Sequence, residues 1–141
     1  MSELNYDKFR DSLKRLEERY EDYKKSLNRP ELLASDRESI KESCIQRFEV
    51  CFDTTWKHLK KYLEQDQGIA DLANSPKAIF KQALAAKVID DAEVWIEFSD
   101  KRTSTSHDYS GKKADEVFGQ VDDFIEEAIT LYETMTQQKW K

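Results

Sequence analysis

The sequence predicts an all-α protein, an antiparallel up-and-down four-helix bundle with a split or kinked third helix. Apolar residues recur at steps of three and four along most of the 141 residues, and no stretch alternates with the period of a strand. Only three glycines and two prolines interrupt the chain. A chain of this size buries roughly 70% of the surface that its unfolded form exposes. We therefore expect residues 1–141 to form one helical domain.

The first two expected helices follow directly from these periods. Residues 6–27 place their apolar side chains on one side for about three heptads, and Pro30 ends this helix because proline disfavours helix in the residue before it. Residues 36–65 form the second helix, with Asp36 as a candidate N-cap and Gly68 as a stop signal. Its expected buried residues are Ile40, Cys44, Phe48, Cys51, Phe52, Thr55, Trp56, Leu59 and Leu63.

A polar connection leads to the second half of the bundle. Ser75 supplies an N-cap hydroxyl and Pro76 a first-turn proline, so a third helix begins there. Asp90 and Asp91 interrupt it before a further helical stretch, and a last helix is expected over residues 112–137. Because short connections force neighbouring helices to run in opposite directions, these elements form an up-and-down bundle.

Composition limits the classes of function. The 23 basic and 29 acidic residues give a net charge of −6, which argues against a nonspecific grip on nucleic acid. Cys44, Cys51 and His58 follow one another at seven-residue steps, roughly 10 Å apart along one helix, too far for a disulfide or a shared zinc ion. We expect no metal and no cofactor. Without a membrane-length apolar run or a signal core, a cytoplasmic protein with no membrane partner is expected.

Polar, chemically capable side chains crowd into residues 99–109, between the third and last helices. Arg102 carries a permanently charged fork suited to a phosphate, and His107 can give or take a proton near neutral pH. Tyr109 adds a phenolic oxygen that can be modified. By itself this spacing is weak evidence, because a lone histidine is more often structural than catalytic.

A second cluster lies in the second expected helix. Glu49, Phe52 and Trp56 share one helical face. In one interpretation the aromatic rings belong to the core, and Glu49 lies at its rim and pairs with a basic group such as Arg102. In the other, Glu49, Phe52 and Trp56 form one wall of a nucleotide or substrate cleft, and the bound molecule stacks on Trp56 or Trp95, although tryptophans are more often core anchors.

The order and spacing of these motifs resemble the HEPN superfamily and, within it, the nucleotidyltransferase substrate-binding proteins. The resemblance covers roughly residues 4–135, and its motifs are Ile45-Gln46-Arg47-Phe48-Glu49, Phe52, Trp56-Lys57, Leu63, Ser75-Pro76, Trp95 and Arg102-x4-His107-x-Tyr109. It implies a four-helix bundle that forms a homodimer, with the segments around Arg102 and His107 of two copies meeting in a shared cleft. It also implies a partner, a minimal nucleotidyltransferase encoded by a neighbouring gene.

Two functions follow from the resemblance. In the first, the protein is a non-catalytic subunit of a two-component nucleotidyltransferase or toxin–antitoxin system, and it presents a substrate or its own Tyr109 for transfer of AMP. The chain has no Gly-Ser followed by Asp-x-Asp, so another chain must carry out the transfer. The alternative is a metal-independent HEPN ribonuclease toxin that the partner neutralises, with Arg102 holding phosphate and His107 acting as general acid or base. Thr103 stands where the family commonly has an asparagine, which counts against RNA cleavage.

Overall fold

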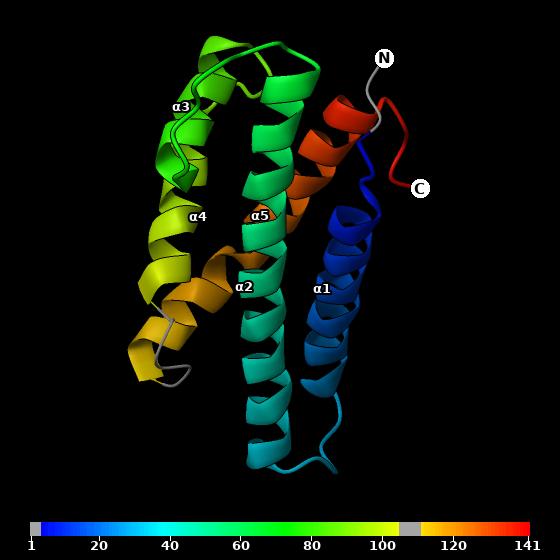
Figure 1. Cartoon of the computed structure of the whole chain (residues 1–141). Helices are drawn as coiled ribbons and strands as arrows, with labels where there is room; N and C mark the ends of the chain where they lie inside the picture. Colours follow the sequence, from blue (N-terminus) through cyan, green and yellow to red (C-terminus); the bar gives the residue numbers. More distant parts are fainter. Residues whose placement is uncertain (1–3, 105–110) are drawn as a thin grey trace.

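The protein is all-helical in residues 4–104 and 111–141, which the structure, a computed structural model, describes. The helices are α1 (Asp7–Ser26), α2 (Ala34–Gln65), α3 (Pro76–Ala85), α4 (Ala92–Ser104) and α5 (Gly111–Thr136). Successive helices α1, α2, α4 and α5 alternate in direction, and α5 crosses α2 obliquely (Figure 1). The predicted all-α class is confirmed. Among these residues, no helix combines the length and hydrophobicity that a bilayer span requires.

Helices α1 and α2 form a helical hairpin. The apolar stripe of α1 is fully buried as far as Leu16, whereas Leu27 is 59% exposed and Ile40 is partly exposed. Both lie at the end of the hairpin, where α2 extends beyond the other helices (Figure 1). Leu33, not Asp36, is the N-cap of α2; the Asp36 carboxylate instead accepts a hydrogen bond of 3.1 Å from the Leu33 N–H. The predicted cap is wrong by three residues, because the acid satisfies the helix end from inside the first turn.

The predicted interruption of the third helix is a complete split. Helix α3 ends where the Val88 N–H donates to the Ala83 carbonyl at 2.9 Å, and Lys87 adopts the left-handed conformation with φ 63°. Asp91 Oδ1 then accepts from the Val94 N–H at 3.3 Å, which caps the start of α4. The two short helices pack against each other.

An aromatic cluster joins α2, α4 and α5. The ring centroid of Phe124 lies 5.0 Å from that of Phe48, 5.3 Å from that of Phe98 and 5.9 Å from that of Trp95, all in edge-to-face geometry. None of these four side chains is more than 1% exposed. Edge-to-face pairs fix ring orientation as well as burying area. The cluster therefore fixes α4 against α2, and with it the polar residues at the end of α4.

Helix α4 continues into the polar segment of residues 99–109, which the sequence predicts to lie between helices. It ends only at Ser104, so residues 99–104 are helical, and this part of the expected connection is wrong. The Thr103 hydroxyl donates to the Ser99 carbonyl of its own helix at 3.1 Å. Such intrahelical bonds let threonine remain in a helix without a tertiary partner.

Candidate functional site

Arg102, near the C-terminal end of α4, lies against two acidic side chains of α2. We call Arg102, Glu49 and Asp53 the arginine cluster. Arg102 Nη1 donates to Glu49 Oε2 at 3.1 Å, while Nε and Nη2 donate to Asp53 Oδ1 and Oδ2 at 3.2 and 3.0 Å. The contact with Asp53 is the two-bonded fork that guanidinium and carboxylate groups favour. Glu49 and Asp53 are four residues apart, so α2 presents both on one face.

Burial and charge distinguish the members of the arginine cluster. The exposed fraction of the side chain is 9% for Glu49, 27% for Arg102 and 39% for Asp53. An ionised carboxylate as buried as Glu49 needs a counter-ion, and Arg102 supplies it. The predicted pairing of Glu49 with Arg102 is confirmed. Asp53 is absent from the predicted residues, although its spacing of four from Glu49 was a signal for a shared face.

One positive and two negative charges give the arginine cluster a net negative charge. An anion that approaches Arg102 therefore also meets the repulsion of Glu49 and Asp53. The cluster is better suited to hold α4 and α2 together than to attract a phosphate from solution.

The two predicted tryptophans have different surroundings. Trp56 of α2 is 8% exposed, and the Lys57 ammonium lies 5.9 Å from the centre of its ring. Trp95 of α4 is 1% exposed and stacks on Phe80 with ring centroids 5.0 Å apart. Trp95 also lies two helical turns before Arg102, about 10 Å along the axis. The structure thus brings Glu49 to Arg102, whereas Trp95 faces another part of the molecule.

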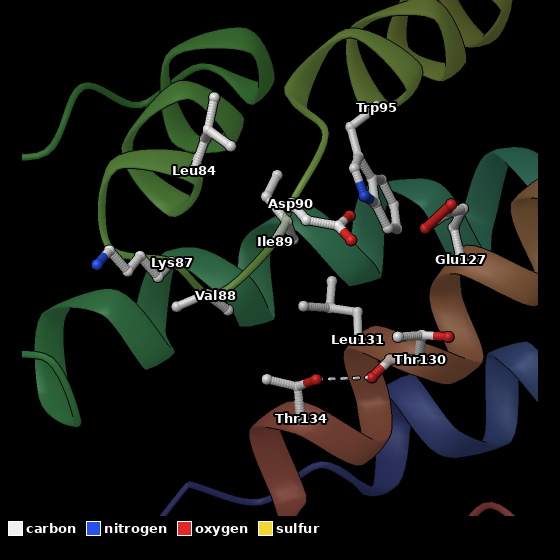
Figure 2. A pocket seen from close by; sticks show the side chains of 10 residues that line it. All are labelled: Leu84, Lys87, Val88, Ile89, Asp90, Trp95, Glu127, Thr130, Leu131 and Thr134. Carbon is white, nitrogen blue, oxygen red and sulfur yellow. Dashed lines mark hydrogen bonds between the residues drawn. The ribbon is translucent and has the colours of Figure 1, made fainter.

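That part is a pocket of about 460 Å³ where the connection between α3 and α4 meets α5, which we call the α3–α5 pocket. Its lining is apolar at Leu84, Val88, Ile89, Trp95 and Leu131 and polar at Lys87, Asp90, Glu127, Thr130 and Thr134 (Figure 2). Burial, followed by the negative charges of Asp90 and Asp91, raises the pKa of Glu127. No sequence motif predicted this pocket.

Side chains that could bind a metal ion are not grouped together in the described part of the chain. No group of three or more histidine, cysteine, aspartate or glutamate side chains is placed there to hold an ion. Cys44 and Cys51 are buried free thiols, and burial raises the pKa of each to about 12. Neither therefore supplies a thiolate at neutral pH.

His107 and Tyr109 lie outside the described residues, because residues 105–110 are not described. Their predicted roles, and their predicted meeting with Arg102, stay predictions. Arg102 is the member of the predicted triplet that the structure describes.

Residues 4–137 match the family described as nucleotidyltransferase substrate binding protein like. The chain belongs to this family. A Haemophilus influenzae relative named probable ribonuclease HepT is 34% identical over 104 residues, which are 72% of this chain and 71% of the relative. The family predicted from the motifs is therefore confirmed.

Solved structures agree with this assignment. HI0074 of Haemophilus influenzae has a structure described as revealing the fold of a substrate binding domain of a nucleotidyltransferase. It is 28% identical to this chain, with a TM-score of 0.84, and the match covers 95% of this chain and 100% of that chain. A Thermus thermophilus protein has the same fold, with a TM-score of 0.65 over 86% of this chain and 98% of that chain at 24% identity. The helical fold is thus shared along almost the whole length of these chains.

We expect Arg102→Ala to lower the free energy of unfolding by about 2 kcal/mol, because it removes the counter-ion of the buried Glu49 carboxylate. Glu49→Gln in the Arg102→Ala protein should restore part of this loss. Urea unfolding measures both effects. The control is Lys77→Ala, whose pair with Asp100 is 52% and 59% exposed and should change stability by at most about 0.5 kcal/mol. Equal losses in Arg102→Ala and Lys77→Ala would contradict the structural role of the arginine cluster.

A second expectation concerns pH. The pKa of Glu127 is higher in the folded protein than its value of 4.5 in the unfolded chain. At pH values above the folded pKa, the ionised carboxylate therefore destabilises the folded protein. Below pH 4.5 the carboxyl group is protonated in both states, and this penalty is absent. Glu127→Gln should therefore raise the melting temperature at pH 7, and the gain should disappear as the pH falls to about 4. Glu126→Gln, which removes the same charge from an exposed neighbour, should give a smaller gain at pH 7. A gain for Glu127→Gln that does not depend on pH would refute the assignment.

Proposed function

We propose that this protein, as one helical domain of residues 1–141, is the non-catalytic substrate-binding partner of a separate minimal nucleotidyltransferase in the cytoplasm. Membership of the nucleotidyltransferase substrate binding protein like family supports the proposal. The observation that carries it is the arginine cluster, in which two carboxylates neutralise Arg102. A phosphate-cleaving site needs its arginine to receive an anion, which this arrangement opposes.

The proposed assembly is a homodimer in which two copies bring the segments that follow Arg102 into one cleft. Glu49 and Trp56 would contribute to the α2 side of this cleft. The partner would transfer AMP from ATP, either to a bound substrate or to Tyr109. In the second case the phenolic oxygen bonds to the α-phosphorus, the bond to pyrophosphate breaks, and the phenol proton passes to a base, for which His107, two residues earlier in the sequence, is a candidate.

Thr103 gives further support to the non-catalytic role. Its hydroxyl donates to the Ser99 carbonyl, and the residue is exposed, so it adds no polar group to the arginine cluster. A threonine in this state does not replace the amide that the family commonly has beside the arginine.

The test is co-expression with the nucleotidyltransferase encoded by the neighbouring gene, followed by size-exclusion chromatography and intact mass. We expect the two proteins to elute together, and ATP to add the mass of one adenylate, unless the substrate is a separate molecule. Tyr109→Phe should abolish an adduct on the protein, whereas Tyr23→Phe, at a partly exposed tyrosine of α1, should retain it. Separate elution of the two folded proteins would overturn the proposal.

A metal-independent ribonuclease is the second candidate, because the 34% identical relative is named probable ribonuclease HepT. If this alternative holds, the isolated protein cleaves RNA in the presence of a chelator, and His107→Ala abolishes cleavage. If the protein is non-catalytic, RNA stays intact with both the unmodified protein and the His107→Ala variant. His58→Ala is a control for loss of the chain's other histidine, which is buried in α2. Cleavage that the chelator does not affect and that His107→Ala alone removes would favour the ribonuclease.

A further inference from the structure

The α3–α5 pocket is lined by an indole N–H that forms no hydrogen bond within the described part of the chain. Trp95 is 1% exposed, and its ring is fixed by the stacked Phe80 and by edge-to-face contacts with Phe98 and Phe124. Its indole Nε1 donates no hydrogen bond to any residue in the ranges 4–104 and 111–141. By contrast, Nε1 of Trp140 donates to Glu17 Oε1 at 2.9 Å. The Trp95 side chain is almost fully buried, but its indole nitrogen is not fully enclosed, so its N–H can donate to one acceptor that enters the pocket.

The unsatisfied donor faces the pocket. Figure 2 shows the nitrogen-bearing edge of Trp95 on the side where the Asp90 carboxylate lies, with the Glu127 carboxylate beyond the other side of the ring. Asp90 and Glu127 line the same pocket, and neither forms an ion pair within the described part of the chain. The pocket thus combines one fixed neutral donor with two carboxylate acceptors.

The remaining lining is compatible with a small organic molecule. Thr130 and Thr134 donate their hydroxyl protons to backbone carbonyls of α5, at 3.2 and 3.0 Å, so their oxygens are left as acceptors. Val88, Ile89 and Leu131 provide an apolar wall. A volume of about 460 Å³ lies within the range of small-molecule sites. Lys87 is the one cation of the lining, so the two carboxylates leave the pocket net negative.

We propose that the α3–α5 pocket binds a small amino alcohol. The negative charges of Asp90 and Glu127 attract its ammonium group, and its hydroxyl oxygen accepts a hydrogen bond from the Trp95 indole N–H. Its carbon skeleton covers the apolar wall. This inference deepens the proposed function, and it rests on that function only in taking the bound molecule as the substrate of nucleotidyl transfer, for which the hydroxyl is a chemically suitable acceptor.

The test uses the full chain alone and a matched series of six-carbon probes: 6-amino-1-hexanol, 1,6-hexanediol, hexylamine and 6-hydroxyhexanoate. The readout is the indole N–H resonance of Trp95 in a nitrogen–proton NMR spectrum, assigned with Trp95→Phe. We expect 6-amino-1-hexanol to shift this resonance saturably, with millimolar affinity for so small a probe. The other three probes should bind at least several-fold more weakly, because each lacks the ammonium or the hydroxyl, or carries the opposite charge.

Two variants locate the ammonium. Asp90→Asn and Glu127→Gln should each weaken 6-amino-1-hexanol binding about tenfold, since each removes one of the two negative charges that attract the ammonium. Glu126→Gln, one residue from Glu127 but outside the lining, should bind like the unmodified protein. Circular dichroism verifies that every variant is folded.

The outcomes separate this proposal from the proposed function. Absence of a saturable shift, equal binding of 1,6-hexanediol or 6-hydroxyhexanoate, or an equal loss in Glu126→Gln would overturn the amino alcohol site. None of these measurements involves the nucleotidyltransferase, so such a result leaves the co-elution test unaffected. Conversely, saturable binding together with separate elution of the two proteins would establish the pocket as a ligand site and overturn its role in nucleotidyl transfer.

Discussion

The contact of Phe124 with aromatic rings of α2 and α4 is the interaction on which the rest of the structure depends. It joins helices that are distant in sequence, and its edge-to-face geometry fixes orientation as well as distance. The same contact orients both candidate sites. Trp95 belongs to the aromatic cluster and to the α3–α5 pocket, and Arg102 lies farther along the helix that the cluster holds.

Local sequence signals predicted much of the fold, because they act over one or two helical turns. The apolar periods placed the long helices to within a few residues, and the Ser75 hydroxyl caps α3 by accepting from the Ala78 N–H at 3.4 Å, as predicted. The error at Asp36 has a local cause as well, since an acid stabilises a helix start from either the N-cap or the first turn. The sequence alone does not determine whether Asp36 is the N-cap or lies in the first turn of α2.

The candidate sites were less predictable because they depend on contacts between distant residues. The pairing of Glu49 with Arg102 could be predicted from the sequence, since a buried carboxylate on an aromatic helix face needs a nearby cation. The fork between Asp53 and Arg102 required the position of α4 relative to α2, which no periodicity gives. The α3–α5 pocket depends on three segments and on the fully buried position of Trp95, and these are properties of packing rather than of spacing.

The left-handed backbone of Lys87 links the end of α3 to the shape of the α3–α5 pocket. A residue with a Cβ at such a position costs roughly 1 kcal/mol, which glycine would avoid. This turn also sets the directions in which Val88 and Ile89 leave α3, and both residues line the pocket. A relative that terminates α3 with a different turn would therefore present a differently shaped cavity on an unchanged bundle. The shape of the cavity can therefore differ between relatives without any change in the aromatic cluster or the Arg102 pairing.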